Sequence, residues 1–169
     1  DIRPLKPEPY RIRCVVGGDK LDYSEDTGSP TTNLLETKLL LNSTISDSRR
    51  GARFCSIDLK DFFLATHMKE KECMKLHLDY IPADIIEKYN LLELAIDGYV
   101  YIEIMKGMYG LKQAANCFYR LLVSVMCSIK YNKSFADPCL YHRWDDEKGL
   151  LIWATWCDDL LAMGRNEEA

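Results

Sequence analysis

The feature that most constrains the fold is a pair of apolar, β-prone segments that meet at two adjacent aspartates. Residues 150–156 (LLIWATW) and 160–164 (LLAMG) are separated only by Cys157, Asp158 and Asp159. Short apolar runs with so short a connection predict a β-hairpin. Two neighbouring carboxylates repel each other unless a cation lies between them. The pattern therefore predicts an antiparallel pair of strands with an acidic site where they meet.

A third carboxylate can complete this acidic site. Asp58 lies near the end of another β-prone segment, residues 53–59. Mg²⁺ prefers carboxylate oxygens combined with substrate phosphates, and two such ions about 4 Å apart can activate a hydroxyl and stabilise a leaving group. Asp58, Asp158 and Asp159 are thus candidate ligands of a two-metal site. The competing interpretation of paired aspartates is a solvated turn, which is what we expect for residues 145–147.

The rest of the chain alternates between helical and strand-like patterns. Asn33 can cap a helix, and Glu36 stands three residues later, in the spacing of a capping box. The helix-like segments are 33–44, 83–94 and 113–130, and the strand-like segments are 10–16, 53–59, 73–78, 99–105 and 139–143. With the hairpin, this order predicts an α+β fold in which helices pack on an antiparallel sheet.

Length and charge exclude several classes of protein. A chain of 169 residues is one domain or part of one. It has 22 Lys and Arg against 26 Asp and Glu, so its net charge of −4 argues against a uniformly basic nucleic-acid module, whereas a protein with its basic residues confined to one face stays possible. We suspect a fragment of a longer protein, because the chain starts without Met.

Cysteine usage and hydropathy bear on the compartment. The seven cysteines are odd in number and none form a C-x-x-C pair, which argues against a disulfide framework or a zinc site and favours a reducing compartment. No apolar run approaches the ~18 residues of a membrane span, and the first residues lack the apolar core of a signal peptide. We expect an intracellular protein of the cytoplasm or nucleus with no membrane partner.

Seven segments, in order along the chain, carry a family resemblance. Residues 156–159 (WCDD) resemble the Y-x-D-D box of reverse transcriptases. Residues 58–64 (DLKDFFL) and 106–114 (KGMYGLKQA) resemble the D-V-K-T-A-F-L and K-x-L-Y-G-L-K-Q-A stretches of copia-type retrotransposon polymerases. The remaining four matching segments are 10–15, 22–30, 38–41 and 136–141. The sequence is therefore similar to copia-type reverse transcriptases, which are RNA-directed DNA polymerases, over almost its whole length.

The resemblance implies the fingers and palm of a right-hand polymerase, with the thumb missing. By this correspondence, residues of about 1–50 and 66–110 are fingers-like, and about 51–65 and 111–169 are palm-like. The implied protein is a C-terminally truncated part of a retrotransposon polyprotein, without its thumb and ribonuclease H portions. Because the thumb grips the duplex in this family, this piece alone is expected to hold primer and template weakly.

The resemblance also implies the chemistry and the residues that perform it. The implied reaction is template-directed DNA synthesis from deoxynucleoside triphosphates, on an RNA or DNA template with a primer, with two Mg²⁺ or Mn²⁺ ions. The implied residues are Asp58, Asp158 and Asp159 for catalysis; the same three with the carbonyl of Leu59 for the metals; Arg11, Arg13, Phe63 and Gln113 for the nucleotide; and Tyr109, Lys112, Trp156 and Cys157 beside primer or template.

Some positions depart from the family pattern. Trp156 replaces the usual Tyr and cannot donate a hydroxyl, Gly17 stands where the family often has Lys, and residues 116–118 (NCF) differ from the common P-R-L-W run. Two alternatives to an active polymerase stay open: an inactive remnant of a mobile element, and a non-catalytic nucleic-acid-binding module that reuses the palm. The three intact aspartates argue against the second, because a pure binder gains nothing from carboxylates that repel one another.

Overall fold

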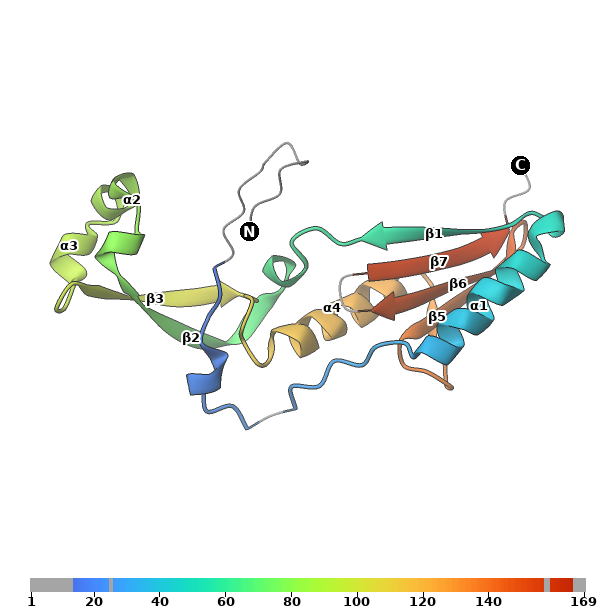
Figure 1. Cartoon of the computed structure of the whole chain (residues 1–169), viewed down its shortest axis with the longest axis horizontal. Helices are drawn as coiled ribbons and strands as arrows, with labels where there is room; N and C mark the ends of the chain where they lie inside the picture. Colours follow the sequence, from blue (N-terminus) through green and yellow to red (C-terminus); the bar gives the residue numbers. More distant parts are fainter. Residues whose placement is uncertain (1–13, 25, 157–158, 166–169) are drawn as a thin grey trace.

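The computed structural model describes residues 14–24, 26–156 and 159–165. The molecule is elongated, with a five-stranded sheet and two long helices at one end and a two-stranded arm at the other (Figure 1). Both sheets are antiparallel, so the predicted α+β class is confirmed.

The five-stranded sheet contains the predicted hairpin. It consists of β1 (Ala52–Asp58), β4 (Asn132–Lys133), β5 (Leu140–Asp145), β6 (Gly149–Trp156) and β7 (Asp159–Arg165). The strand order is β1-β7-β6-β5-β4. The strands from β4 to β7 follow one another in space as they do in sequence. β1, the first strand in the chain, lies beside β7, the last, and this long-range pairing places the end of β1 next to the β6–β7 connection.

Helix α4 (Ala114–Ser128) provides the main core by covering one face of this sheet. Its apolar side packs against the segment that follows β1 and against the strands of the five-stranded sheet. The buried residues of this cluster are Phe62, Phe118, Leu122, Met126, Tyr131, Tyr141 and Leu160. The core therefore fixes the chain immediately beyond Asp58 against α4.

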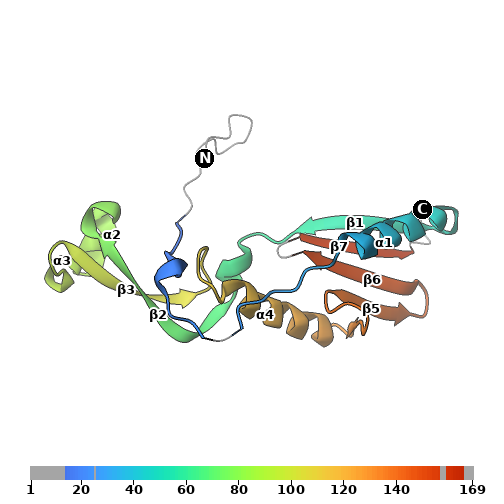
Figure 2. The ribbon, with the colours of Figure 1, turned by 60° about the horizontal axis from the view of Figure 1, so that its bottom comes forward.

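Helix α1 (Leu34–Ser46) packs against β1 and β7 (Figure 2). Its N-terminus is capped as predicted, because the Asn33 side chain accepts hydrogen bonds from the backbone N–H groups of Leu35 (2.8 Å) and Glu36 (3.1 Å). Two backbone donors that the first turn would leave unpaired are thereby satisfied.

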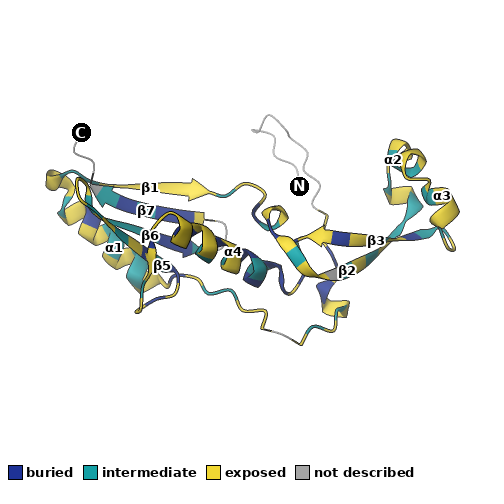
Figure 3. Cartoon of the chain, turned by 180° about the vertical axis from the view of Figure 1, so that it is seen from behind, coloured by how far each residue is buried: buried dark blue, intermediate teal, exposed yellow. Residues whose placement is uncertain are grey.

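Strand β1 is an exposed edge of the sheet. Every residue of β1 after Ala52 is exposed, and the Phe54 side chain keeps 56% of its surface in solvent. Figure 3 shows β1 as exposed, whereas β7 next to it is largely buried. The inner strands and α4 thus provide most of the buried core, and β1 is held chiefly by its ladder with β7.

The arm is a long hairpin with short helices at its tip. It consists of β2 (His67–His77) and β3 (Tyr99–Lys106), with α2 (Ala83–Lys88) and α3 (Leu91–Leu94) between them. The prediction of one helix over 83–94 is wrong. Asn90 has φ +52°, a left-handed conformation that interrupts a right-handed helix and that Asn tolerates better than most residues.

The predicted strand over 10–16 falls largely outside the described residues, which begin at Cys14. Within the described part, Cys14 to Val16 belong to no strand. Val16 is instead joined to the loop after β3 by a backbone hydrogen bond, in which its N–H donates to the carbonyl of Tyr109 at 2.8 Å. One bond of this kind attaches the segment without building a ladder. In the part of the chain that the structure describes, no helix is long and apolar enough to span a membrane.

Candidate functional site

Two of the predicted acidic residues meet at the end of the five-stranded sheet. Asp58, the last residue of β1, lies directly opposite Asp159, the first residue of β7, in the antiparallel register. Side chains at directly opposed positions point to the same face, with Cβ atoms ~5 Å apart. Both residues are exposed. The sheet therefore holds two carboxylates side by side at an open edge.

The face that carries this pair is open at the acidic end. Successive side chains of a strand point to opposite faces. Leu160 joins the core under α4, so its neighbour Asp159 lies on the other face. Met163, four residues beyond Asp159, shares that face and lines a cavity with Leu40 and Thr44 of α1. Helix α1 thus covers the far end of the face and leaves the end with the carboxylates accessible.

The donor set suits a hard divalent cation, although only part of it is described. Two adjacent carboxylates repel each other, and a cation between them removes that repulsion. Asp158, Cys157, Arg11 and Arg13 lie outside the described residues. Among the described residues, no group of three His, Cys, Asp or Glu side chains is placed to hold a metal ion.

Trp156 borders the acidic pair and also anchors the chain that leads into α1. It lies opposite Asp159 in the β6–β7 register. Its indole Nε1–H donates to the carbonyl of Thr32 at 2.8 Å. Thr32 is buried, and its own N–H donates to the carbonyl of Thr155 at 3.1 Å. The indole N–H, the one polar group that Trp offers in place of a Tyr hydroxyl, is therefore engaged within the protein.

Trp156→Phe is expected to lower the free energy of unfolding by about 1–2 kcal/mol, because it leaves the Thr32 carbonyl without this donor. Urea denaturation followed by circular dichroism measures the change. Trp144→Phe is the matched control, since the Trp144 side chain is 70% exposed and its removal should cost under about 0.5 kcal/mol. Equal losses in the two variants would contradict a stabilising role for the Trp156–Thr32 bond.

Phe63 is held in a cluster of aromatic rings. It lies in a 3₁₀ turn, Phe62–Ala65, a few residues after Asp58. Its ring packs edge-to-face against Phe62, with centroids 4.8 Å apart, and against Tyr109, with centroids 5.0 Å apart. Phe62 is buried, whereas Phe63 and Tyr109 are each half-buried. Phe63 thus has one side in the core and another toward solvent.

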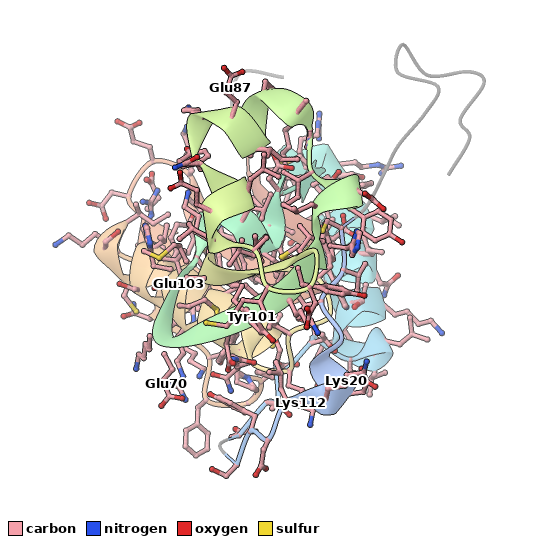
Figure 4. The ribbon with its side chains drawn as sticks, turned by 90° about the vertical axis from the view of Figure 1, so that its left-hand side faces the viewer. Lys20, Glu70, Glu87, Tyr101, Glu103 and Lys112 are labelled. Carbon is pink, nitrogen blue, oxygen red and sulfur yellow. The ribbon has the colours of Figure 1, made fainter. Side chains whose placement is uncertain are left out.

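Gln113 and Lys112 form hydrogen bonds within the protein. The Gln113 side chain is only 2% exposed, and its Nε2 donates to Oε1 of Glu72, on β2, at 2.8 Å. The Lys112 ammonium donates to the carbonyl of Leu21 at 2.8 Å, and Figure 4 labels this lysine in a view along the molecule from the arm end. These two residues join the start of α4 to the arm and to the N-terminal segment.

Asn116 explains one departure from the family pattern. It is buried, and its Nδ2 donates to the carbonyls of Asp26 at 3.1 Å and Gly28 at 2.8 Å. The amide thus fixes the loop before α1 against α4. Sequence reasoning did not identify this contact, nor those of Glu72 and Thr32, because residues so far apart in the chain share no local pattern.

Comparisons with known proteins show what the chain is similar to in sequence. The family model described as "Reverse transcriptase (RNA-dependent DNA polymerase)" matches residues 3–169. Among curated proteins, the chain is 26% identical over 162 residues to "Retrovirus-related Pol polyprotein from transposon TNT 1-94" of Nicotiana tabacum. That alignment covers 94% of this chain and 11% of the polyprotein, so the chain spans a small part of its relative. No solved structure matches the chain significantly.

Proposed function

The chain belongs to the reverse transcriptase family, and on this premise we propose that it carries out template-directed DNA synthesis as part of a longer retrotransposon polyprotein. The observation that supports the proposal most is the direct opposition of Asp58 and Asp159 on an open sheet face. A structural strand end gains nothing from two facing carboxylates, whereas nucleotidyl transfer requires them.

Asp58, Asp159 and Asp158 would hold two Mg²⁺ or Mn²⁺ ions, with the carbonyl of Leu59 assisting. When bound, such ions lower the pKa of a primer 3′-hydroxyl and neutralise charge on the leaving pyrophosphate. The contribution of the chain is to hold the carboxylates on one rigid face, so that catalysis is mainly positioning and charge stabilisation. The β1–β7 ladder supplies that rigidity at Asp58 and Asp159.

We propose that the five-stranded sheet and α4 form the palm of a right-hand polymerase and that the β2–β3 arm forms part of the fingers. Helix α1 was assigned to the fingers-like range 1–50 by resemblance. Because it packs on β1 and β7, we place α1 with the palm. The division is otherwise the one proposed from the sequence.

The nucleotide would bind between the acidic pair and the arm. Phe63 is proposed to exclude a ribose 2′-hydroxyl, a role that fits a ring with one side held in the core and another exposed. Arg11 and Arg13 are proposed to contact the triphosphate, for which guanidinium groups are well suited. Gln113 would support this pocket through its bond to Glu72.

Primer and template would lie along the open sheet face. Trp156 borders Asp159 there, and because its N–H is bonded to Thr32, it would meet a primer through its apolar ring surface. We propose that Cys157, the next residue after Trp156, also lies beside the primer or template. Tyr109 and Lys112, in the loop that leads to α4, are proposed near the nucleotide and template.

Primer extension on an RNA template, with Mg²⁺ and with Mn²⁺, tests this function. We expect DNA products that require both template and divalent ion. A circular-dichroism melt of the same preparation shows whether the chain is folded. A cooperative melt without extension, both for this chain and for the same chain within a longer polyprotein segment, would contradict the proposal and favour an inactive remnant. Binding of primer–template with no extension under any metal would favour a nucleic-acid-binding module.

A further inference from the structure

The rings around Phe63 fix its orientation from two sides. Phe62 and Tyr109 both meet it edge-to-face, at interplanar angles of 78° and 85°. Phe62 is 3% exposed and packs in turn on Phe118, with ring centroids 3.6 Å apart. Phe62 therefore belongs to the core, whereas half-buried Tyr109 borders Phe63 nearer the surface.

Tyr109 is held in place by its backbone. Its carbonyl accepts a hydrogen bond from Val16 N–H at 2.8 Å. Gly110, the next residue, has φ +93°, and a Cβ there would lie 2.0 Å from the Val16 carbonyl oxygen. Gly107 is also closely packed, since a Cβ at that position would lie 2.6 Å from the carbonyl oxygen of Phe63. The loop thus fits tightly between Phe63 and the N-terminal segment.

Gln113 cannot be the residue that holds the Phe63 ring together with Phe62. Its side chain is 2% exposed and is bonded to Glu72, so the amide faces the junction between α4 and the arm. Of the described residues that the resemblance associates with nucleotide, template or primer, Tyr109 is the one whose ring contacts Phe63.

We propose that Tyr109 is a positioning residue for sugar selection, which holds the Phe63 ring at the tilt that excludes a 2′-hydroxyl. The inference rests on the proposed function and deepens it, because it assigns a specificity role to a residue that acts through another. If the ring of residue 109 is lost, Phe63 loses one of its two described edge-to-face ring contacts, so its ring can turn away from the sugar. Edge-to-face contacts are weak individually, so we expect discrimination to fall about three- to tenfold.

The test is the ratio of kcat/KM for dUTP to that for UTP in primer extension by the full chain, because these two nucleotides differ only at the 2′ position. Tyr109→Leu should lower this ratio about three- to tenfold, mainly through a lower KM for UTP. Tyr109→Phe keeps the ring and should restore the wild-type ratio. Tyr101→Leu is the matched control, because Tyr101 lies on β3 in the arm and is 63% exposed (Figure 4).

A double variant separates positioning from direct contact. If Tyr109 acts through Phe63, Tyr109→Leu added to Phe63→Ala should change the ratio no further than Phe63→Ala alone. Independent losses that multiply in the double variant would overturn the inference. So would a wild-type ratio in Tyr109→Leu. Thermal melts show whether each variant is folded, and Tyr109→Met replaces Tyr109→Leu if the latter does not fold.

Failure of the proposed function and failure of the inference about Tyr109 give different results. A wild-type chain that extends no primer contradicts the proposed function, and the inference falls with it. A wild-type chain that extends primers and prefers dUTP over UTP, together with an unchanged preference in Tyr109→Leu, overturns the inference alone.

Discussion

Replacing Asp58 with Asn is expected to lower the rate of DNA synthesis about a thousandfold while the chain stays folded. In the proposed site, metal ions held by the carboxylates would contribute several kcal/mol of transition-state stabilisation, and each 1.36 kcal/mol corresponds to a factor of ten in rate. Asp58 is exposed and faces Asp159, so the substitution removes a like-charge repulsion and breaks no packing. Its expected effect on stability is therefore neutral or slightly favourable, unlike that of a core substitution.

Binding of divalent ions gives a readout that is independent of turnover. Mg²⁺ or Mn²⁺ should raise the melting temperature of the wild-type chain, because a ligand that binds only the folded state stabilises it. The rise should be much smaller in Asp58→Asn and in Asp159→Asn. Asp146→Asn is the matched control, since Asp146 lies in the exposed turn between β5 and β6. The same metal-induced rise in all four proteins would exclude the acidic pair as the metal site.

Phe62→Ala is expected to lower the free energy of unfolding by about 3–5 kcal/mol. Phe62 is 3% exposed and packs against Phe118 of α4, so its removal leaves a cavity between α4 and the segment beyond β1. A loss of this size is a large fraction of the ~5–15 kcal/mol that stabilises a typical domain. Because Asp58 directly precedes that segment, the rate of DNA synthesis should fall together with stability.

Urea denaturation measures the loss, and the chain supplies a control of the same residue type. The side chain of Phe135 is fully exposed, at 107% of its reference surface, so Phe135→Ala should change stability by less than about 0.5 kcal/mol. A Phe62→Ala variant as stable as Phe135→Ala would mean that α4 is held to the sheet by other contacts.

Local patterns predicted most of the elements, because capping, alternation and turn chemistry act over a few residues. The Asn33 cap and the β6–β7 hairpin are confirmed on these grounds. The break at Asn90 was missed because the helical spacing over 83–94 continues through it, and a positive φ leaves no signal in apolar periodicity.

The site was predicted unevenly for a related reason. Charge repulsion between carboxylates pointed to Asp58 as a partner of the hairpin aspartates, and β1 does place it opposite Asp159. The bonds of Gln113 to Glu72 and of Trp156 to Thr32 were not predicted. These hydrogen-bond partners are determined by tertiary packing. The family resemblance related Gln113 to the nucleotide and Trp156 to the primer or template, and it carries no information about their neighbours within the protein.

The pairing of the first strand of the sheet with the last determines the order in which the sheet can form while the chain is being translated. The arm closes within a contiguous stretch, β2 to β3, whereas β1 pairs with β7, about a hundred residues later. At roughly 5–20 residues per second, β1 leaves the ribosome about 5–20 s before its partner exists. Throughout that interval its backbone edge is unpaired and its apolar side chains are exposed, which favours aggregation. The acidic pair forms only when β7 arrives, so the proposed metal site cannot exist until the sheet closes.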